Sequence, residues 1–593
     1  MKDRLICRDT RCADVRFQDG ALLHAAGVHS FQVLRANREH PELADGFGWT
    51  YNHAPMLAWY HGKLYCEYLS NPADEHEVPG QTLLTVSENG MDWSFPEVIF
   101  PVITVPMAQY KGPRSPLLKD EMQTVPHQRM GFYHAPNGVL LVLSFYGIVH
   151  DREISMPCDG WGVGRAVRRI FPDGTLGDIR FLLYNTPAGY TAENTPVFSP
   201  YQSSADKDFV AACEALLLDG PVMQQMYEEQ RFDKTLFPAP REQALSFYTI
   251  SGHEMMGVYK KGLAAVSADG GRTFGEITEN PTIRTATGKV WGQRTPDGKF
   301  ALFYNPTKDG QHRWPIAAVT GEDGHTFGHM LAVTGWMSPL RYGGADKNLG
   351  PQYLRGICER NPQTPDGDVW LTYSNNKEDI WISRISVPIA GGQDHEITET
   401  FGEALPRAWN LYSPAWAQVR AEADCLCLTD RDPYDRAAVE RVFRPAETGE
   451  IALRLRADAV AEQGAVCMEL QSDNGSVPVR VSLRADGQIY VLTDGRMEPA
   501  AAFTPGTEMK IVIAFDCTLS RAKITVNGKT LARNFCASVN TVCRFALFTK
   551  ESRQIPYSTV DTVGKYTTRE QALPGGCDPV PETKVRLFSF SLK

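Results

Sequence analysis

One stretch gathers the residue types needed for proton transfer beside a carboxylate. Residues 127–134 read HQRMGFYH, and strand alternation would place His127, Arg129 and Tyr133 on one face. An imidazole titrates near neutral pH, a phenol can shuttle a proton, and a guanidinium binds a carboxylate bidentately. This set suits elimination next to a uronate, and a solvated strand face is the structural alternative.

Similar polar side chains lead into other apolar stretches of the chain. His53 is a candidate general base or sugar ligand, and Trp291 is a candidate sugar platform. Further candidates for binding hydroxyls or a carboxylate are Gln293, Arg294, Arg313 and Arg355. Each of these residues could instead make structural contacts between neighbouring strands.

Hydrolysis would need a different set, because it usually uses two carboxylates about 5–9.5 Å apart. Glu193 opens a long insertion, Glu242 lies near the end of it, and Glu359 lies further along the chain, so these three are the candidate carboxylates. Arg231 lies in the same charged stretch as Glu242 and is a candidate substrate ligand. A buried ion-pair network is the alternative for Arg231 and Glu242.

The elements that must position these residues form an internal repeat. Each copy has a strand, a turn and a second strand of alternating apolar and aromatic residues. The five copies are residues 54–70, 130–147, 245–262, 292–306 and 357–376. Asn137-Gly138, Asp297-Gly298 and Asp366-Gly367 predict tight hairpin turns, because these residues tolerate positive φ.

A short motif follows several of these hairpins. Residues 267–274 fit the pattern S-x-D-x-G-x-T-[WF], with Asp269 as the carboxylate, and residues 320–327 fit it with Glu322 in that place. Residues 87–94 are a shortened variant. The motif resembles the Asp-box of sialidase-type β-propellers. That resemblance implies a structural role, in which the carboxylate holds an outer turn and the aromatic residue packs between blades.

We therefore predict an all-β chain, a β-propeller followed by a jelly-roll β-sandwich. Residues 1–400 form the propeller, with six blades favoured and five or seven as alternatives, at ~45–60 residues per blade. A helix-containing insertion is expected at 186–243, covering the working face. Residues 401–440 are expected to be a connector, and 441–593 a concanavalin-like sandwich that braces the propeller.

The architecture resembles the sialidase-like superfamily of carbohydrate-active enzymes, which includes propeller rhamnosidases and uronate lyases. Sialidases use three Arg residues on the substrate carboxylate, a Tyr nucleophile paired with a Glu, and an Asp acid. The Arg-Ile-Pro segment that usually carries the first Arg is missing here, and only Arg35 stands in that region. The chain is therefore placed nearer to propeller rhamnosidases and uronate lyases than to true sialidases.

The composition limits the classes of binding partner and the cellular compartment that we expect. The chain has 60 Lys and Arg against 70 Asp and Glu, so a nucleic-acid partner is not expected. No apolar run reaches the ~20 residues of a membrane span, and no secretory signal is visible. The 13 Cys, an odd and scattered number, are expected to be mostly buried free thiols in a cytoplasmic protein. No cofactor motif is present, and the sequence does not exclude a structural cation in the propeller channel. It also leaves a homodimer as an alternative to a monomer.

These observations converge on one expectation about function. The polar residues that precede the repeat hairpins, several of them Arg, would meet at the propeller centre and form a positive pit in an acidic protein. We expect exo-acting cleavage of a glycosidic bond in uronate- or sialate-containing oligosaccharides. Uronate β-elimination is one alternative to hydrolysis, and a non-catalytic glycan-binding propeller is another.

Overall fold

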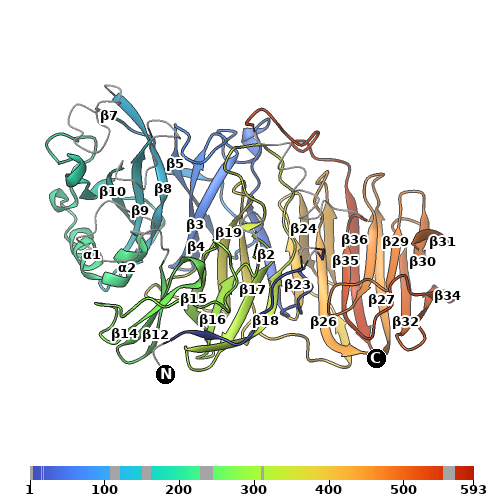
Figure 1. Cartoon of the computed structure of the whole chain (residues 1–593). Coiled ribbons are helices and arrows are strands. Elements are labelled where there is room, and N and C mark those ends of the chain that lie inside the picture. Colours follow the sequence, from blue (N-terminus) through green and yellow to red (C-terminus); the bar gives the residue numbers. More distant parts are fainter. Residues whose placement is uncertain are drawn as a thin grey trace.

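The computed structural model describes residues 4–14, 16–17, 19–106, 121–149, 162–226, 245–308, 313–493, 495–551 and 568–593, except for the side chains of 127–130. Two β-rich parts lie side by side in an elongated molecule, with the propeller on the left and the sandwich on the right (Figure 1). The predicted fold class, an all-β propeller followed by a sandwich, is confirmed.

The described part of the propeller is built from five sheets, whose strands pair antiparallel except for the edge strand β1. The first two contain β3 (Tyr51–Tyr60), β4 (Lys63–Asn71), β5 (Gln81–Ser87) and β6 (Glu97–Phe100), then β7 (Thr104–Pro106), β8 (Glu121–His134), β9 (Leu140–Ile148), β10 (Gly162–Ile170) and β11 (Arg180–Tyr184). The third and fourth contain β12 (Ser246–Ser251), β13 (Glu254–Val258) and β14 (Ala264–Ser267), then β15 (Trp291–Arg294), β16 (Phe300–Tyr304), β17 (Ile316–Gly321) and β18 (Thr326–Thr334), with β1 (Ile6–Cys7) at the edge. The fifth contains β19 (Pro351–Gly356), β20 (Val369–Asn375), β21 (Asp379–Ile385) and β2 (Val28–Leu34).

The strands that contact neighbouring blades at the propeller centre are β3, β8, β12, β15 and β19. Strand β3 contacts both β8 and β19, and β15 contacts both β12 and β19. The N-terminal strand β2 pairs with β21 and so completes the last blade. Five sheets correspond to one of the alternatives rather than to the favoured six blades. The length-based count fails because residues 185–226 of the insertion contain helices but no strand of a further blade.

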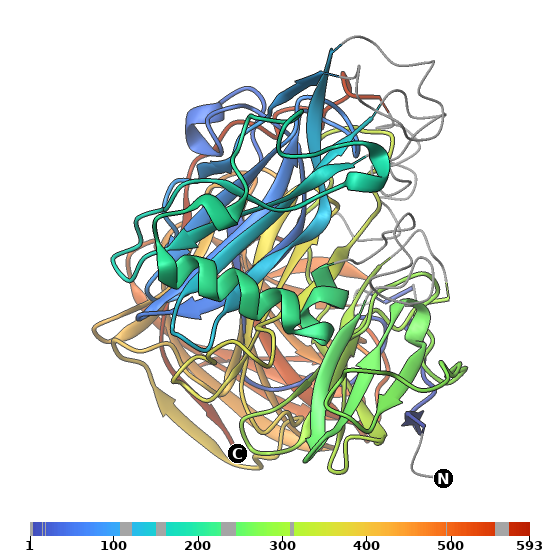
Figure 2. The ribbon, with the colours of Figure 1, turned by 90° about the vertical axis from the view of Figure 1, so that its left-hand side faces the viewer.

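The insertion contains two α-helices, α1 (Lys207–Leu218) and α2 (Gly220–Met226), where one was predicted. Asp206 caps the first helix by accepting a hydrogen bond from the backbone amide of Phe209. The side chain of Asn137, at the far turn of β8 and β9, donates to the backbone of Asp208. The helices pack against this hairpin and against residues of two other blades, and Asp219, between the helices, pairs with Arg360 of the last blade (Figure 2). Short 3-10 turns lie at Pro41–Leu43, Thr186–Ala188, Tyr201–Ser203 and Lys260–Gly262.

The Asp-box interpretation holds, with one correction. Oδ1 of Asp269 accepts a hydrogen bond from the amide of Thr273 at 2.9 Å, and Asn89 holds the shortened variant in the same way. In the third motif the carboxylate that ties the turn is Asp323, which accepts from Thr326, and not Glu322. Glu322 points outward and pairs with Lys299, because the actual turn is offset by one residue from the pattern.

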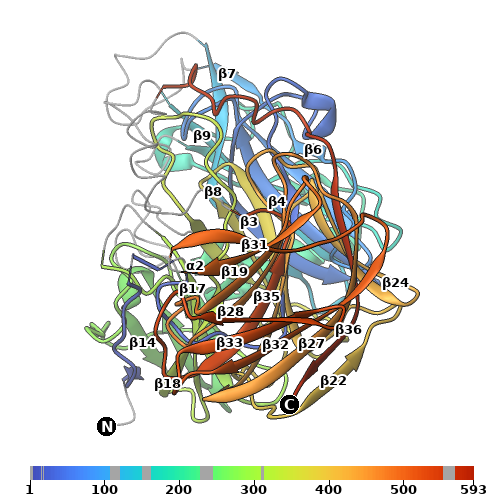
Figure 3. The same ribbon diagram turned by 90° about the vertical axis from the view of Figure 1, so that its right-hand side faces the viewer.

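The sandwich consists of two sheets packed face to face (Figure 3). One contains β23 (Trp409–Ser413), β26 (Ala438–Ala446), β35 (Val542–Phe548), β28 (Val466–Gln471), β29 (Val479–Leu483), β30 (Gln488–Thr493) and β31 (Arg496–Ala502). The other contains β24 (Ala417–Glu422), β25 (Cys425–Asp430), β36 (Thr583–Leu592), β27 (Thr448–Ala459), β32 (Glu508–Asp516), β33 (Arg521–Val526) and β34 (Lys529–Asn534), with β22 (Ile397–Thr400) against β36. Their alternating side chains form one apolar core.

The expected connector at 401–440 is wrong. It contains β23, β24, β25 and the start of β26, which pair within both sheets of the sandwich. Strand β23 also runs parallel to β2 of the last blade, so one eleven-stranded sheet joins the two domains. The rings of Trp381 and Tyr412 stack at 4.9 Å across this junction.

Two global features bear on the remaining expectations. The cysteines of the described residues are free thiols, and most of them are buried, as predicted. None of the helices in the described ranges has both the length and the apolar character required to cross a bilayer.

Candidate functional site

Irregular backbone marks one level of the propeller centre. The ladders of β3, β8 and β19 each shift register, between His53 and Met56, His127 and Gly131, and Gln352 and Arg355. Ala54 and Tyr353 have φ of 51° and 55°, which residues other than glycine rarely adopt. Bulges and such strained residues concentrate near functional sites, where they re-aim side chains. The bulge in β8 also breaks the strict alternation expected for residues 127–134.

Side chains from three blades meet at this level, and we call them the propeller-end cluster. Its members are Tyr51 and His53 of β3, Glu75 of the β4–β5 loop, Lys289 before β15, Arg313 of the β16–β17 loop, Tyr353 of β19, and Lys377 of the β20–β21 turn. His53 and Tyr51 are fully buried, whereas Glu75 and Arg313 are only partly buried. Lys289 and Lys377 are also buried, so Glu75 and Arg313 are the charged members of the cluster that reach toward the solvent.

His53 is held in a fixed orientation. Its Nδ1 lies 2.7 Å from Oγ of Ser374, and its ring centroid lies 4.1 Å from that of Tyr353. Nε2 of His53 is buried and has no hydrogen-bond partner among the described residues. Because Nδ1 is engaged, Nε2 is the ring atom left to exchange a proton or to bind a ligand.

The surroundings of His53 are positively charged. Burial lowers the pKa of His53 well below its usual value, and Lys377, Lys289 and Arg313 lower it further, against the opposing effect of Glu75. Nζ of Lys289 lies 3.3 Å from the ring centroid of Tyr353, a cation–π distance. The imidazole is therefore neutral, and an anion placed here would be attracted.

A carboxylate and a phenol also meet in the cluster. Although burial opposes ionisation, Lys377 lowers the pKa of Glu75 well below its usual value. Nζ of Lys377 lies 2.6 Å from Oε2 of Glu75. Burial raises the pKa of Tyr51, and the charge of Glu75 raises it further. An ionised carboxylate next to a protonated phenol can accept the phenolic proton during a reaction.

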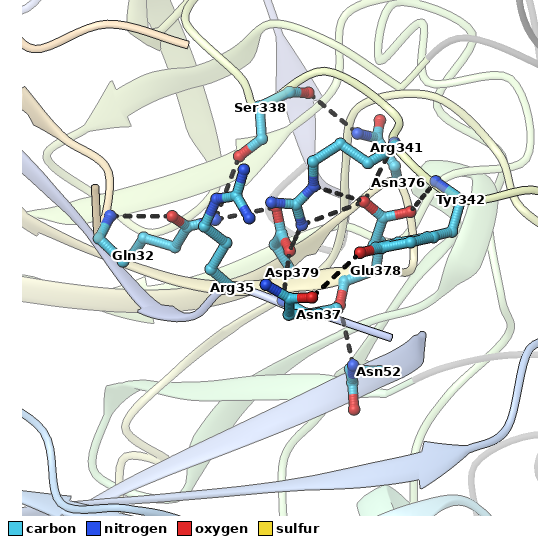
Figure 4. Close-up of polar contacts among 12 residues, drawn as sticks. Gln32, Arg35, Asn37, Asn52, Ser338, Arg341, Tyr342, Asn376, Glu378 and Asp379 are labelled. Carbon is cyan, nitrogen blue, oxygen red and sulfur yellow. Dashed lines mark hydrogen bonds and ion pairs between the residues drawn. The ribbon is translucent and has the colours of Figure 1, made fainter. Parts of the chain in front are cut away.

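A network of buried ion pairs fixes the turn that carries Lys377 (Figure 4). Glu378 accepts hydrogen bonds from the backbone amides of Arg341 and Tyr342 at 3.1 and 3.0 Å. It also pairs with Nζ of Lys347 at 2.9 Å and with the guanidinium of Arg341. These contacts bind the turn to the loop that follows β18.

Neighbouring contacts extend this network to the N-terminal strand and to β3 (Figure 4). Asp379 pairs with Arg341 and accepts a hydrogen bond from Nε2 of Gln32 at 2.8 Å. Nδ2 of Asn52 donates to the backbone oxygen of Glu378 at 3.0 Å. The fully paired Arg341 is therefore a scaffold residue that positions Lys377 relative to His53.

Three of the predicted binding residues lie together in the propeller interior. Nε1 of Trp291 donates to Oε1 of Gln293 at 2.8 Å, and the Arg355 guanidinium lies 6.0 Å from the Trp291 ring. All three are buried between β15 and β19. Arg313 and His53 are members of the propeller-end cluster itself.

Other predicted residues lie elsewhere. Arg294 is exposed at the opposite end of β15, next to its hairpin turn. Tyr133 packs in the apolar group that includes α1 and α2, near Asp219, and burial raises its pKa to about 12. Burial and the charge of Glu193 raise the pKa of Tyr184, which lies on the outermost strand of its blade. A hydrogen bond from Thr191 lowers the pKa of Glu193. The side chains of His127 and Arg129, together with Arg231 and Glu242, lie outside the described residues.

Sequence reasoning missed the charged partners of His53. Glu75 lies in a loop after a second strand rather than before a first one, and Lys377 lies in a turn. The only sequence signal for Lys377 was its run of polar neighbours from Asn375 to Asp379. In the part of the chain that the structure describes, no group of three His, Cys, Asp or Glu residues is placed to hold a metal ion.

Comparisons with known proteins agree with the fold. The family model described as BT_1020-like, N-terminal beta propeller, matches residues 3–243, and the one described as sialidase-like, CBM domain, matches residues 409–564. Among curated proteins, no significant match to the chain was found.

A solved structure named "Sialidase" superimposes with a TM-score of 0.93 at 35% sequence identity, covering 100% of this chain and 54% of that chain. The present chain thus spans about half the length of that relative. A mutant of Trypanosoma rangeli sialidase displaying trans-sialidase activity reaches a TM-score of 0.33 at 9% identity, covering 91% of this chain and 90% of that one. Trypanosoma rangeli sialidase reaches 0.31 at 10% identity, with coverage of 92% and 91%.

The fold, the two family models and the structure at 35% identity supply the classification that residue chemistry alone left open. The chain is a sialidase-like β-propeller followed by a sialidase-like sandwich domain, an architecture that supports a carbohydrate-active or glycan-binding role.

Proposed function

We propose that the protein is an exo-acting carbohydrate-active enzyme that cleaves a glycosidic bond in uronate- or sialate-containing oligosaccharides at the propeller-end cluster. The observation that carries this proposal is the convergence of Lys289, Arg313 and Lys377 around the neutral His53. In a protein with a net charge of -10, such a local positive field would select an anionic sugar.

Hydrolysis is the reaction that Tyr51 and Glu75 support best. The phenolic proton of Tyr51 would pass to Glu75 while the phenolic oxygen bonds to the anomeric carbon. The glycosidic bond would break, and the leaving oxygen would take its proton from water. The hydroxide left from that water would then displace the sugar from Tyr51, and Glu75 would return its proton to the phenolate oxygen.

A specific observation favours a second reaction, β-elimination next to a uronate. Nε2 of His53 is buried and has no hydrogen-bond partner among the described residues. The lowered pKa of His53 keeps the imidazole uncharged. A neutral imidazole could remove the proton next to the carboxylate, while the cations stabilise the negative charge that develops there. A C=C double bond would then form as the bond to the leaving sugar oxygen breaks, and that oxygen would take the proton from the imidazolium.

A single assay separates the two reactions. The protein is incubated with oligosaccharides capped by uronate or sialate, and reducing-sugar release is followed together with ultraviolet absorbance. Sugar release without absorbance indicates hydrolysis, and an absorbance increase indicates an unsaturated uronate and hence elimination. If neither signal appears while acidic sugars still bind, the result contradicts catalysis and supports a glycan-binding propeller.

A further inference from the structure

A second polar site lies between the propeller and the sandwich, away from the propeller-end cluster. We propose that this interface cavity binds a neutral sugar residue of an oligosaccharide. Its volume is about 330 Å³, near the lower end of the ~300–1,000 Å³ typical of small-molecule sites. The residues that carry the argument are Trp336, Arg436, Glu469, Arg480, Phe548 and Glu551.

The polar groups of the cavity are held rigidly by one another. Nε of Arg480 donates to Oε1 of Glu469 at 2.6 Å, and Nε2 of Gln471 donates to Oε2 of the same carboxylate at 2.7 Å. A carboxylate oxygen can accept a second hydrogen bond, and a guanidinium has five N–H groups. Glu469 and Arg480 therefore keep capacity to bind sugar hydroxyls in fixed directions.

Aromatic surface lies beside these polar groups. Trp336, from the propeller, is only partly buried, and its ring lies 5.5 Å from that of Tyr412. On the sandwich side, the Arg436 guanidinium covers the Phe548 ring at 3.9 Å. A sugar ring has an apolar C–H face and polar edges, so a partly exposed Trp next to oriented polar groups suits it.

The charge balance of the cavity distinguishes its ligand from that of the propeller. Glu469 is paired with Arg480, and Glu551 is paired with Arg484 at 2.7 Å. Arg544 in the floor is paired with Asp19 at 2.6 Å. Since these cations face carboxylates, the cavity offers donors and acceptors in comparable number. This pattern fits uncharged hydroxyls rather than an anionic sugar.

A second hollow borders the cavity on the sandwich. This hollow, of about 660 Å³, shares Glu551 with the cavity and is also lined by Arg484, Asp486 and Lys550. Asp486 is oriented by the hydroxyl of Tyr490, which donates to it at 2.6 Å. The two hollows together would hold adjoining residues of one neutral oligosaccharide, with a terminal sugar against Trp336.

The test is calorimetric titration of the full chain with neutral probes, namely galactotetraose, arabinotetraose, xylotetraose and cellotetraose. We expect at least one to bind, and Trp336→Ala and Arg480→Ala each to weaken that binding by about tenfold or more. Arg454→Ala is the matched control, because Arg454 is exposed on the other sheet and pairs with Glu508. Lys377→Met, which alters only the propeller-end cluster, should leave neutral-probe binding unchanged.

The outcomes separate this proposal from the proposed propeller function, on which it does not rest. The proposal would be overturned if every neutral probe failed to bind. It would also be overturned if binding survived both cavity variants or was lost in Lys377→Met. Thermal unfolding checks that Trp336→Ala is folded, and Arg480→Ala, which lies at the partly exposed mouth, gives a second independent result.

Discussion

Nζ of Lys377, on a turn of the last blade, lies 2.6 Å from Oε2 of Glu75, on a loop of the first blade. The pair joins the two blades at which the propeller closes. It also keeps Glu75 ionised despite its burial, because the cation outweighs the desolvation of the carboxylate. The protonation state of Glu75 thus depends on a residue some 300 positions away in the sequence.

This dependence predicts a pH effect. In Lys377→Met, burial is no longer opposed by the main cation, so the pKa of Glu75 should rise. The acid limb of the kcat/KM profile on an acid-capped oligosaccharide should therefore move to higher pH. An acid limb at the same pH in the variant and the wild type would show that Glu75 is not the group that must be ionised.

Removing the proposed nucleophile or its base should abolish turnover without unfolding the protein. Tyr51→Phe and Glu75→Gln are each expected to lower kcat by about 100-fold or more, because both act at the reacting bond. Tyr65→Phe is the matched control, since Tyr65 is another buried tyrosine of the same blade outside the cluster. Full activity in Tyr51→Phe would contradict nucleophilic hydrolysis and leave the elimination route through His53.

His53 should stay neutral where an ordinary histidine titrates. Burial and then Lys377 lower its pKa below the usual 6.5. Nitrogen chemical shifts of the imidazole ring, followed by NMR from neutral to mildly acidic pH, should show no titration of His53 near pH 6.5. A midpoint at or above that value would mean that the cluster lacks the positive field on which the proposed substrate class depends.

The stability of the two-domain assembly should decrease as the pH rises. His24 is buried between Asp19 at 3.1 Å and Glu440 at 2.7 Å, with Arg544 beside it and Asn410 bonded to Glu440. Burial and Arg544 oppose its charged form, but Glu440 and Asp19 raise the pKa of His24 above 6.5 overall. Its stabilising contribution is therefore complete below pH 6.5 and is lost as the pH rises through the folded value.

Denaturant unfolding at several pH values measures this effect. His24→Gln should flatten the dependence of the unfolding free energy on pH above 6.5 relative to wild type. His395→Gln is a matched control, because His395 lies by the exposed Arg444 rather than between buried carboxylates. Identical pH slopes in His24→Gln and wild type would contradict the assignment.

The scaffold beneath Lys377 should be costly to break. Arg341→Met leaves the buried Glu378 and Asp379 without their shared guanidinium, and we expect a loss of ~3–5 kcal/mol in the free energy of unfolding. Arg294→Met, at an exposed position, should stay within ~0.5 kcal/mol of wild type. Equal stability of both variants in urea would show that the network is not a stabilising scaffold.

Local patterns predicted much of the fold. The Asn137-Gly138 and Asp297-Gly298 turns form as expected, with positive φ at both glycines. The Asp269 motif holds its turn through the contacts that the pattern implies. These features succeed because a tight turn is determined by a few consecutive residues.

Features that depend on distant parts of the chain were predicted less well. The polar, Trp-containing composition of residues 401–440 predicts a connector, and only the pairing of β23 with β2 and of β25 with β36 shows their role in the sheets. Glu75 and Lys377 meet because the first and last blades adjoin. No local sequence pattern around either residue indicates that the two are paired. Of the members of the propeller-end cluster, the sequence therefore predicted only His53 and Arg313 as site residues.

The most direct test of the proposed function compares kcat/KM for an acid-capped oligosaccharide with that for its carboxyl-reduced counterpart, in wild type and in Lys377→Met. If the cations of the propeller-end cluster hold the sugar carboxylate, wild type should prefer the acid by at least about tenfold, and the variant should lose most of that preference. Equal turnover of both substrates by wild type, or an unchanged preference in Lys377→Met, would contradict an anionic-sugar site at this end of the propeller.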